Sequence, residues 1–280
     1  MNSPSIVAAL EISLLSNPGM VRNNNEDAVT SRPGVGLVVL ADGMGGYNAG
    51  EVASGMATAL LGSELERIFG ETAPSTPGPD GKPFAHAALA DQVERANTAI
   101  YQASRSQPQY SGMGTTLVAA VFHDNQVTIA HIGDSRMYRL RGEEFKAITR
   151  DHSLLQEQID AGLITEEQAR NSGNRNLVTR ALGVDPEVQP EIQTLAVEVG
   201  DVYVLCSDGL NDMVEDEEIG MTVGMLAANL ELAATQLVQM ANDNGGRDNV
   251  SVILVKIKQD YAVPHDWWTS LRARLAKWFR

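Results

Sequence analysis

The sequence has little positive charge and few aromatic residues. Its 280 residues include 21 Lys and Arg against 36 Asp and Glu, and the net charge is −15 at pH 7. A surface of this sign repels the phosphate backbone of nucleic acids, which argues against a nucleic-acid-binding protein. If the chain handles phosphate, it must therefore place individual cations close to the site.

Cysteine and long apolar runs are also nearly absent. Cys206 is the single cysteine, so no internal disulfide can form, and its apolar run Val202–Cys206 predicts a buried core thiol rather than a catalytic one. A chain without disulfides fits a reducing cytoplasm. No basic residue precedes the short apolar patch of residues 1–10, which argues against a signal peptide. No apolar run reaches the roughly 20 residues that a membrane-spanning helix needs.

Short β-like runs make up much of the chain. Polar turns at residues 123–125 and 141–143 join some of them, which favours antiparallel hairpins. The predicted strands are Ala8–Leu15, Gly36–Ala41, Thr115–Phe122, Gln126–Ile132, Arg136–Leu140, Ile192–Val199, Val202–Cys206 and Val250–Ile257. The predicted helices are Ala49–Phe69, Phe84–Ser106 and Leu230–Asn242. This order predicts sheets covered by helical layers rather than a parallel βαβ sheet.

Two segments differ from the rest. Residues 151–183 are polar, with short helix signals at His152–Ala161 and Thr165–Asn171, and we interpret them as an inserted flap. We interpret residues 1–263 as one domain and 264–280 as a basic amphipathic tail that holds all three tryptophans. Such a tail fits contact with an anionic membrane surface or a partner's groove through 265–280, and equally a helix packed on its own acidic domain.

The most informative pattern is an aspartate at the boundary of an apolar run. Asp42, Asp134 and Asp208 each follow such a run, and Asp248 lies just before the last predicted strand. A carboxylate at the end of a buried strand is costly unless something pairs with it. Oxygen ligands without His or Cys suit Mg²⁺ or Mn²⁺ rather than Zn²⁺. Each aspartate alone fits a turn or helix cap, but the four together predict a metal cluster at one rim of a sheet.

A second polar cluster lies in residues 21–27. Arg22 could form a fork onto phosphate oxygens, while Glu26 or Asp27 could reach a metal ion or its water. Taken alone, this segment is only a polar loop.

Together these motifs resemble the bacterial form of the type 2C protein phosphatases, which are metal-dependent Ser/Thr phosphatases. The resemblance extends from about Ile12 to Ile257. Its motifs, in the family's order, are Val21-Arg22 with Asn25-Glu26-Asp27, Ala41–Gly46, Gly114–Thr116, Ile132–Arg136, Thr149–Ser153, Arg180–Gly183, Ser207–Leu210 and Gly246–Val250. It implies an α+β fold of two packed antiparallel β-sheets flanked by antiparallel helices, a four-layer α-β-β-α sandwich.

The resemblance also implies which residues hold two core Mn²⁺ or Mg²⁺ ions. Asp42 would bridge the two ions, and Gly43 would offer its backbone carbonyl to one of them. Asp208 and Asp248 would bind the other ion. A water between the ions would attack phosphorus directly, without a phosphoenzyme.

Further roles follow from the same resemblance. Glu26 would act through metal-bound water, with Asp27 supporting its loop, and Arg22 would bind the substrate phosphate. Asp134, together with Asp208, would supply a third and weaker metal site. The flap occupies the place of a mobile segment beside the active site in family members, which implies a role in substrate choice. The alternative is a simple surface excursion.

One position departs from the eukaryotic pattern. Met44 stands where eukaryotic members commonly have a histidine proposed as the general acid. Methionine cannot donate a proton, so the leaving-group acid is unassigned, and a metal-bound water is the best candidate. We interpret His131 and His152 as structural rather than catalytic.

We expect phosphorylated protein substrates, and the resemblance suggests a cognate Ser/Thr kinase or a forkhead-associated protein among them. We expect no nucleic-acid partner, a monomer, and a cytoplasmic protein that is peripheral at the inner membrane if the tail binds lipid. Two alternatives stay open. A two-metal phosphodiesterase or nuclease would use similar carboxylates, but the chain lacks a basic stripe. A catalytically dead phosphatase acting as a binding module would be expected to lose metal ligands, which this chain retains.

Overall fold

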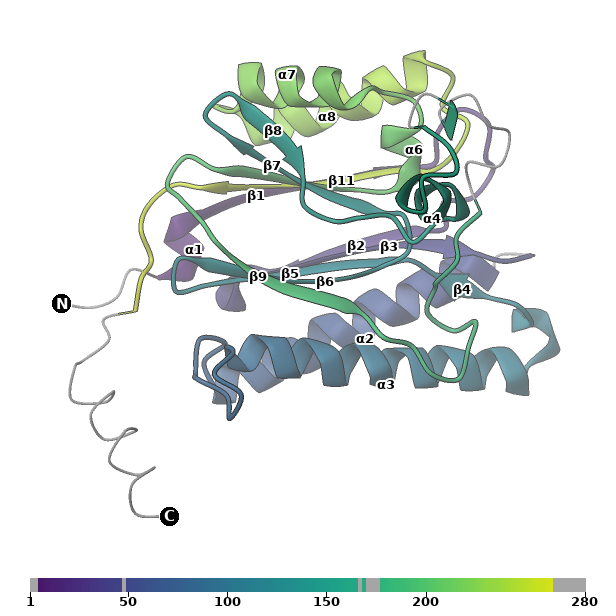
Figure 1. Cartoon of the computed structure of the whole chain (residues 1–280), viewed down its shortest axis with the longest axis horizontal. Coiled ribbons are helices and arrows are strands. Elements are labelled where there is room, and N and C mark those ends of the chain that lie inside the picture. The colour runs from purple at the N-terminus through teal and green to yellow at the C-terminus, as the bar shows by residue number, and fades with distance from the viewer. Residues whose placement is uncertain (1–4, 47–48, 166–167, 170–176, 264–280) are drawn as a thin grey trace.

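Two antiparallel β-sheets pack face to face, and helices cover the outer face of each (Figure 1). The computed structural model describes residues 5–46, 49–165, 168–169 and 177–263. The predicted four-layer arrangement is confirmed. The predicted tail at 264–280, and most of the second flap helix at Thr165–Asn171, lie outside the described residues.

The first sheet has the strand order β1-β11-β10-β7-β8, and all its neighbours pair antiparallel. Its outer face packs against helices α7 and α8, through apolar side chains that include Val204, Leu237 and Leu254. Its elements are β1 Leu10–Asn17, β7 Arg136–Arg141, β8 Glu144–Ala147, β10 Val202–Cys206, β11 Val250–Ile257, α6 Asp208–Asn211, α7 Asp216–Leu226 and α8 Leu230–Asp243.

The second sheet has the order β2-β3-β5-β6-β9, with the short strand β4 paired to β3. Helices α2 and α3 cover its outer face and share a core with Leu37, Val39 and Leu117. Its elements are β2 Asp27–Arg32, β3 Leu37–Met44, β4 Gly114–Thr115, β5 Leu117–His123, β6 Gln126–Ile132, β9 Glu191–Ala196, α2 Ala49–Glu71 and α3 Phe84–Ser106.

A third apolar cluster fills the space between the sheets. Val38 and Leu40 of β3 meet Leu205 of β10 and Ile253 of β11 there. Alternate residues of β3 therefore point into two different cores, and the strand is buried on both faces. This explains why its sequence is a continuous apolar run without alternation.

The observed hairpins and strand bounds agree only in part with those predicted from the sequence. The predicted β5–β6 hairpin turns through Asp124 and Asn125, whose φ values of 45° and 52° are those of a type I′ turn. The strand predicted from Ala8 begins at Leu10 instead, because Ile6–Ala9 forms the short helix α1. The strand predicted to end at Ala41 continues to Met44, because β2 and β4 pair with its last residues.

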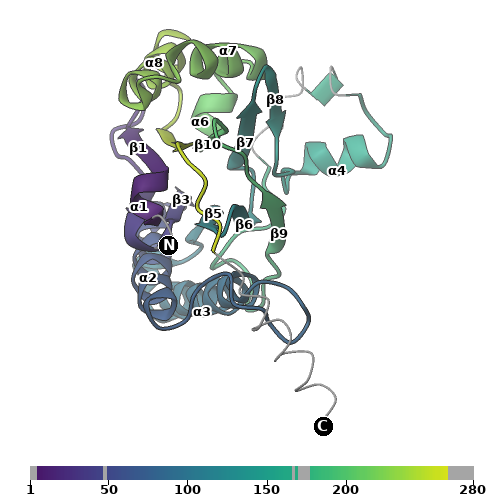
Figure 2. The same ribbon diagram turned by 90° about the vertical axis from the view of Figure 1, so that its left-hand side faces the viewer.

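The flap leaves the body of the molecule beside β8 and β9 (Figure 2). Its helix α4, Leu154–Asp160, begins two residues later than predicted, after Ser153 caps it by accepting a hydrogen bond from the amide of Gln156. An isolated bridge between Ser153 and Val178 joins the outgoing and returning chains. Among the described residues, no helix is both long and apolar enough to cross a membrane.

The core between the sheets generates a stability prediction. Leu40→Ala should lower the free energy of unfolding by about 2–5 kcal/mol, because it removes a fully buried side chain and leaves a cavity. Leu232→Ala, on the half-exposed surface of α8, should change it by less than about 0.5 kcal/mol. Urea unfolding of both variants measures the difference. Equal losses would contradict the assignment of Leu40 to the central core.

Candidate metal centre

The four predicted aspartates come together where the two sheets meet. Asp42 lies near the end of β3 in one sheet, while Asp208 and Asp248 flank β10 and β11 in the other. Asp134 lies in the turn between β6 and β7, which belong to different sheets. The expectation of one rim of a single sheet is therefore wrong: the acids are supplied by both sheets.

The carboxylates lie close enough to raise one another's pKa. Burial raises the pKa of Asp42 well above its ordinary value, and the charges of Asp27, Asp208, Asp134 and Asp248 raise it further. Burial likewise raises the pKa of Asp208, and Asp134 and Asp248 are again among the neighbours that raise it further. A group of acids that raise one another's pKa in this way repels itself until positive charge is supplied.

Asp27 connects the two sheets next to these carboxylates. It pairs with Asp42 across β2 and β3, and its Oδ2 accepts a hydrogen bond of 2.7 Å from the hydroxyl of Ser207, just after β10. The Ser207 hydroxyl in turn accepts the amide of Ser251 in β11 at 3.0 Å. Burial raises the pKa of Asp27 to about 6, although the two serines oppose the shift.

Gly43 lies where the backbone of three segments comes close together. A Cβ at this position would lie 2.2 Å from the carbonyl oxygen of Gly50 and 2.6 Å from that of Glu26, so no side chain fits. The Gly43 amide donates to the Glu26 carbonyl at 3.1 Å, and the Ser54 hydroxyl of α2 donates to the same oxygen at 2.5 Å. The Glu26 loop is thereby held against β3 and α2.

Asn249 fixes the other side of that loop. Its Oδ1 accepts the amide of Glu26 at 2.7 Å, and its Nδ2 donates to the carbonyls of Asn24 and Pro18 at 2.9 and 3.0 Å. Its own amide donates to Asp248 Oδ1 at 2.8 Å. One buried amide side chain therefore sets the position of the loop relative to Asp248.

Arg22 is the cation at this site. Its Nη2 lies 2.6 Å from Asp248 Oδ2, and its side chain is 53% exposed. Burial raises the pKa of Glu26, and the nearby charge of Arg22 opposes this. The guanidinium is thus attached to the acid cluster at one end and open to solvent over about half of its surface.

Asp134 is buried, and burial, with Asp151 nearby, raises its pKa to about 6. Thr116 connects its turn to β3. The Thr116 Oγ1 accepts the amide of Asp42 at 3.1 Å and is hydrogen-bonded to Ser135 Oγ at 2.7 Å. The strand that carries Asp42 and the turn that carries Asp134 are therefore linked by one threonine side chain.

A cavity of about 600 Å³ opens beside this turn. It is lined by Asp134 and Asp208, by α4 of the flap, and by residues 211–212 and 215–217. Arg136 also lines it, and its guanidinium forms two parallel hydrogen bonds to Asp151, at 2.7 and 2.9 Å, and lies 3.7 Å from Asp216. The flap thus borders a space that reaches the acid cluster.

The donor set fits hard divalent cations. Asp42, Asp208, Asp248 and Asp134 supply only carboxylate oxygens, and their mutual repulsion is the kind that bound Mg²⁺ or Mn²⁺ removes. Cys206 is fully buried in the core as predicted, and burial raises the pKa of its thiol. It takes no part in this set.

Sequence reasoning missed three residues that organise the site. Asn249, Thr116 and Ser207 lie in quoted motifs, but none was given a role. Each is a neutral polar residue next to a residue of interest, and only its fully buried or nearly buried position distinguishes it from an ordinary turn residue.

Comparisons with known proteins give one consistent result. The sequence profile of the family described as protein phosphatase 2C matches residues 21–254. Protein phosphatase PhpP of Streptococcus pneumoniae is 39% identical, over 90% of this chain and 100% of that protein. Serine/threonine protein phosphatase PstP of Mycobacterium tuberculosis is 39% identical, over 90% of this chain and 46% of that protein.

Solved structures agree with this. The crystal structure of the Mycobacterium tuberculosis phosphatase PstP/Ppp superposes with a TM-score of 0.80, at 39% identity, over 89% of this chain and 99% of that one. The catalytic domain of PstP in complex with 2 manganese ions superposes with a TM-score of 0.77, at 39% identity and the same coverage.

The repelling carboxylates generate a prediction for the metal-free protein. Folded Asp27 and Asp134 have pKa values of about 6 against an ordinary 3.8, so the folded chain holds protons that the unfolded chain has already released. The free energy of unfolding should therefore fall as the pH rises from about 4 through 6. Thermal melting in EDTA across this pH range measures the change in stability.

A substitution tests the same repulsion. Asp42→Asn should raise the melting temperature of the metal-free protein at pH 7.5 and reduce the further rise in melting temperature that Mn²⁺ causes.

Asp201→Asn is the matched control. Asp201 is buried but accepts two hydrogen bonds of the Arg141 guanidinium, at 2.6 and 2.8 Å. Its neutralisation should lower the melting temperature, since it removes the buried charge paired with Arg141 and leaves that cation only the exposed Glu198 as an acidic partner. If Asp42→Asn is destabilising to the same degree, the carboxylates do not repel one another as described.

Proposed function

Because this chain belongs to the protein phosphatase 2C family, we propose that it hydrolyses phosphoserine and phosphothreonine in proteins with the help of bound Mn²⁺ or Mg²⁺. The observation that carries the proposal is the group of aspartates, supplied by both sheets, whose charges raise one another's pKa beside Arg22. The manganese complex of the PstP catalytic domain supports a centre of two ions.

Five residues would hold these ions. Asp42 would bridge the two core ions, the Gly43 carbonyl would bind one of them, and Asp208 and Asp248 would bind the other. Glu26 would act through a water molecule, because its loop is held against Gly43 and Asn249. We further propose a third, weaker site at Asp134 and Asp208, which both line the cavity beside the flap.

The chain's own residues set the remaining chemistry. Bound divalent ions supply positive charge and lower the pKa of a water molecule so that it can attack phosphorus. Arg22 has five N–H donors and uses one on Asp248, so others can bind phosphate oxygens. Met44 has no proton to donate, so the leaving-group proton comes from water. Buried Cys206 offers no nucleophile, in agreement with direct hydrolysis.

We propose phosphorylated proteins as substrates, with a cognate Ser/Thr kinase or a forkhead-associated protein among them, and a monomeric enzyme. The basic sequence of residues 265–280, outside the described structure, supports peripheral attachment at the inner membrane or to a partner.

Metal removal and one substitution test the reaction. Metal-free protein should not hydrolyse a phosphothreonine peptide, and Mn²⁺ should restore turnover. Asp42→Asn should lower kcat by at least about a thousandfold, because it removes the charge that holds both ions. Asp243→Asn, on the exposed surface of α8, should leave kcat unchanged. Equal turnover with and without metal would contradict the proposal.

The same purified protein tests the two alternative functions. A nuclease or phosphodiesterase would hydrolyse single-stranded DNA or bis-para-nitrophenyl phosphate faster than the phosphopeptide. A catalytically dead phosphatase would bind Mn²⁺ and phosphopeptide without turnover.

Arg22 is tested separately from the ions. Arg22→Ala should mainly raise KM for phosphopeptide, with a smaller loss in kcat, if the guanidinium binds ground-state phosphate and transition state about equally. Arg22→Lys should recover part of the loss, since lysine lacks the planar fork. Arg67→Ala, at an exposed position on α2, is the control. A wild-type KM in Arg22→Ala would remove this residue from the phosphate site.

A further inference from the structure

Two histidines and a glutamate form a cluster apart from the carboxylate group. His131 lies in β6, His152 at the start of the flap, and Glu191 at the start of β9. The two imidazole rings stack with centroids 4.7 Å apart and an interplanar angle of 21°. Both rings are almost completely buried, while Glu191 is exposed.

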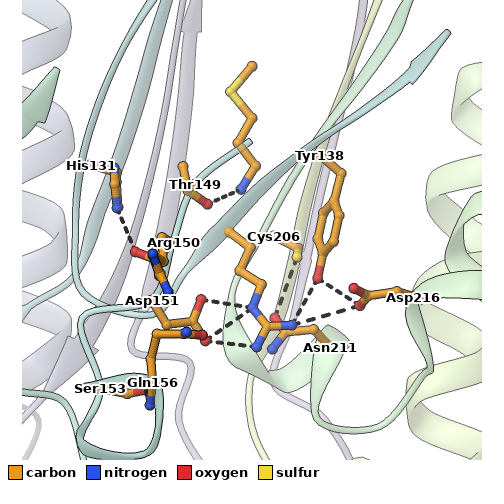
Figure 3. Close-up of polar contacts among 12 residues, drawn as sticks. His131, Tyr138, Thr149, Arg150, Asp151, Ser153, Gln156, Cys206, Asn211 and Asp216 are labelled. Carbon is orange, nitrogen blue, oxygen red and sulfur yellow. Dashed lines mark hydrogen bonds and ion pairs between the residues drawn. The ribbon is translucent and has the colours of Figure 1, made fainter. Parts of the chain in front are cut away.

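The hydrogen bonds determine which ring nitrogens carry protons. The Gly133 amide donates to His152 Nδ1 at 3.2 Å, so His152 Nε2 carries the proton and donates to Glu191 Oε1 at 3.2 Å. His131 Nε2 donates to the Arg150 carbonyl at 2.9 Å (Figure 3).

This arrangement does not suit a metal ion. The three side chains place their candidate ligand atoms within 4.8 Å of one another. A metal-bound histidine, however, offers a lone pair to the ion and donates its other N–H. Here the lone pair of His152 is already used by Gly133, and stacked rings do not point at a common centre. The cluster therefore holds its segments together by hydrogen bonds rather than through a metal ion.

His152 is bonded to three separate segments. Its amide donates to the Gly133 carbonyl at 2.9 Å, which makes the contact with Gly133 reciprocal. Its carbonyl accepts the amide of Thr179, on the returning chain of the flap, at 2.8 Å. Its ring reaches Glu191 at the start of the following strand. The outgoing and returning chains of the flap thus meet the β6–β7 turn at one residue.

The β6–β7 turn connects His152 to Asp134. Gly133 has a φ of +99°, and a Cβ there would lie 2.7 Å from the Thr116 side chain, so only glycine fits at this position. Asp134 follows directly and lines the cavity that α4 borders. Because both the N–H and the C=O of Gly133 are hydrogen-bonded to His152, we expect a displacement of His152 to shift the residue that directly precedes Asp134.

We propose that His152 is a positioning residue that couples the base of the flap, residues 151–154 and 177–183, to the Asp134 turn. By holding the amide of Gly133 it sets where the Asp134 carboxylate lies relative to Asp208. The proposal rests on the proposed function only for the metal-binding role of Asp134; the coupling itself is a property of the metal-free protein.

Two amide substitutions test the Nδ1 and Nε2 contacts of His152 separately. His152→Asn keeps an acceptor near the position of Nδ1 and loses the contact with Glu191. His152→Gln places its amide near the position of Nε2, so it keeps Glu191 and leaves the Gly133 amide without an acceptor. His123→Gln is the control, because His123 is an equally buried histidine. It lies at the end of the β5–β6 pair opposite to His131, and its ring is hydrogen-bonded to Thr128 at 2.8 Å.

Amide hydrogen exchange in metal-free protein and titration with Mn²⁺ give two readouts. In His152→Gln the Gly133 amide should exchange about tenfold faster, since it has lost one buried hydrogen bond. The affinity of the weakest Mn²⁺ site should fall about 10- to 100-fold, as for other residues that orient a metal ligand. His152→Asn should resemble wild type in both. His123→Gln should lower the melting temperature without changing either.

Three outcomes are decisive. Unchanged exchange at Gly133 and unchanged Mn²⁺ affinity in His152→Gln would overturn the coupling, even if the protein is an active phosphatase. Equal losses in His152→Asn and His152→Gln would also overturn it, since the Gly133 contact would then not matter. Faster exchange in His152→Gln alone, in a protein whose wild type binds only two Mn²⁺, would support the coupling and refute the third site at Asp134.

Discussion

Everything at this site depends on holding several carboxylates close together against their mutual repulsion. Asp42 and Asp208 are kept in place by the strands and turns that carry them, and those strands are fixed by apolar packing on both faces. The packed cores therefore oppose this repulsion, together with the ion pair between Arg22 and Asp248. The metal-free site is a strained arrangement, of the kind that costs stability and is retained for function.

The two parts of the centre differ in rigidity. The Glu26 loop is fastened by Asn249 on one side and by Gly43 and Ser54 on the other, so its backbone has few alternatives. Arg22 lies on the same loop but extends into solvent and has one ion pair. Rigid oxygen donors suit ions that require a fixed geometry, whereas an extended guanidinium can follow phosphate groups presented by different proteins.

Sequence patterns predicted the strands that end in aspartate, because apolar runs that stop at an Asp-Gly pair are informative by themselves. They did not predict β2, whose single pairing partner β3 leaves it at the sheet edge with a weakly apolar sequence. They also missed α7, which contains two glycines and packs Gly220 directly against Phe145. The roles of Asn249 and Thr116 depend on contacts with residues 223 and 74 positions away, which no local pattern contains.

Only two of the four acids line the cavity beside the flap. Asp42 and Asp248 belong to the ends of packed strands, and neither lines the cavity that α4 borders. Asp134 and Asp208 line that cavity and also raise the pKa of Asp42, so they are the residues through which the two regions interact. We therefore expect substitutions on the surface of α4 to change which protein segments fit the cavity, while Asp42 and Asp248, which do not line it, keep their positions. A change that reaches the Asp134 turn or Asp208 would alter both the cavity and the acid cluster.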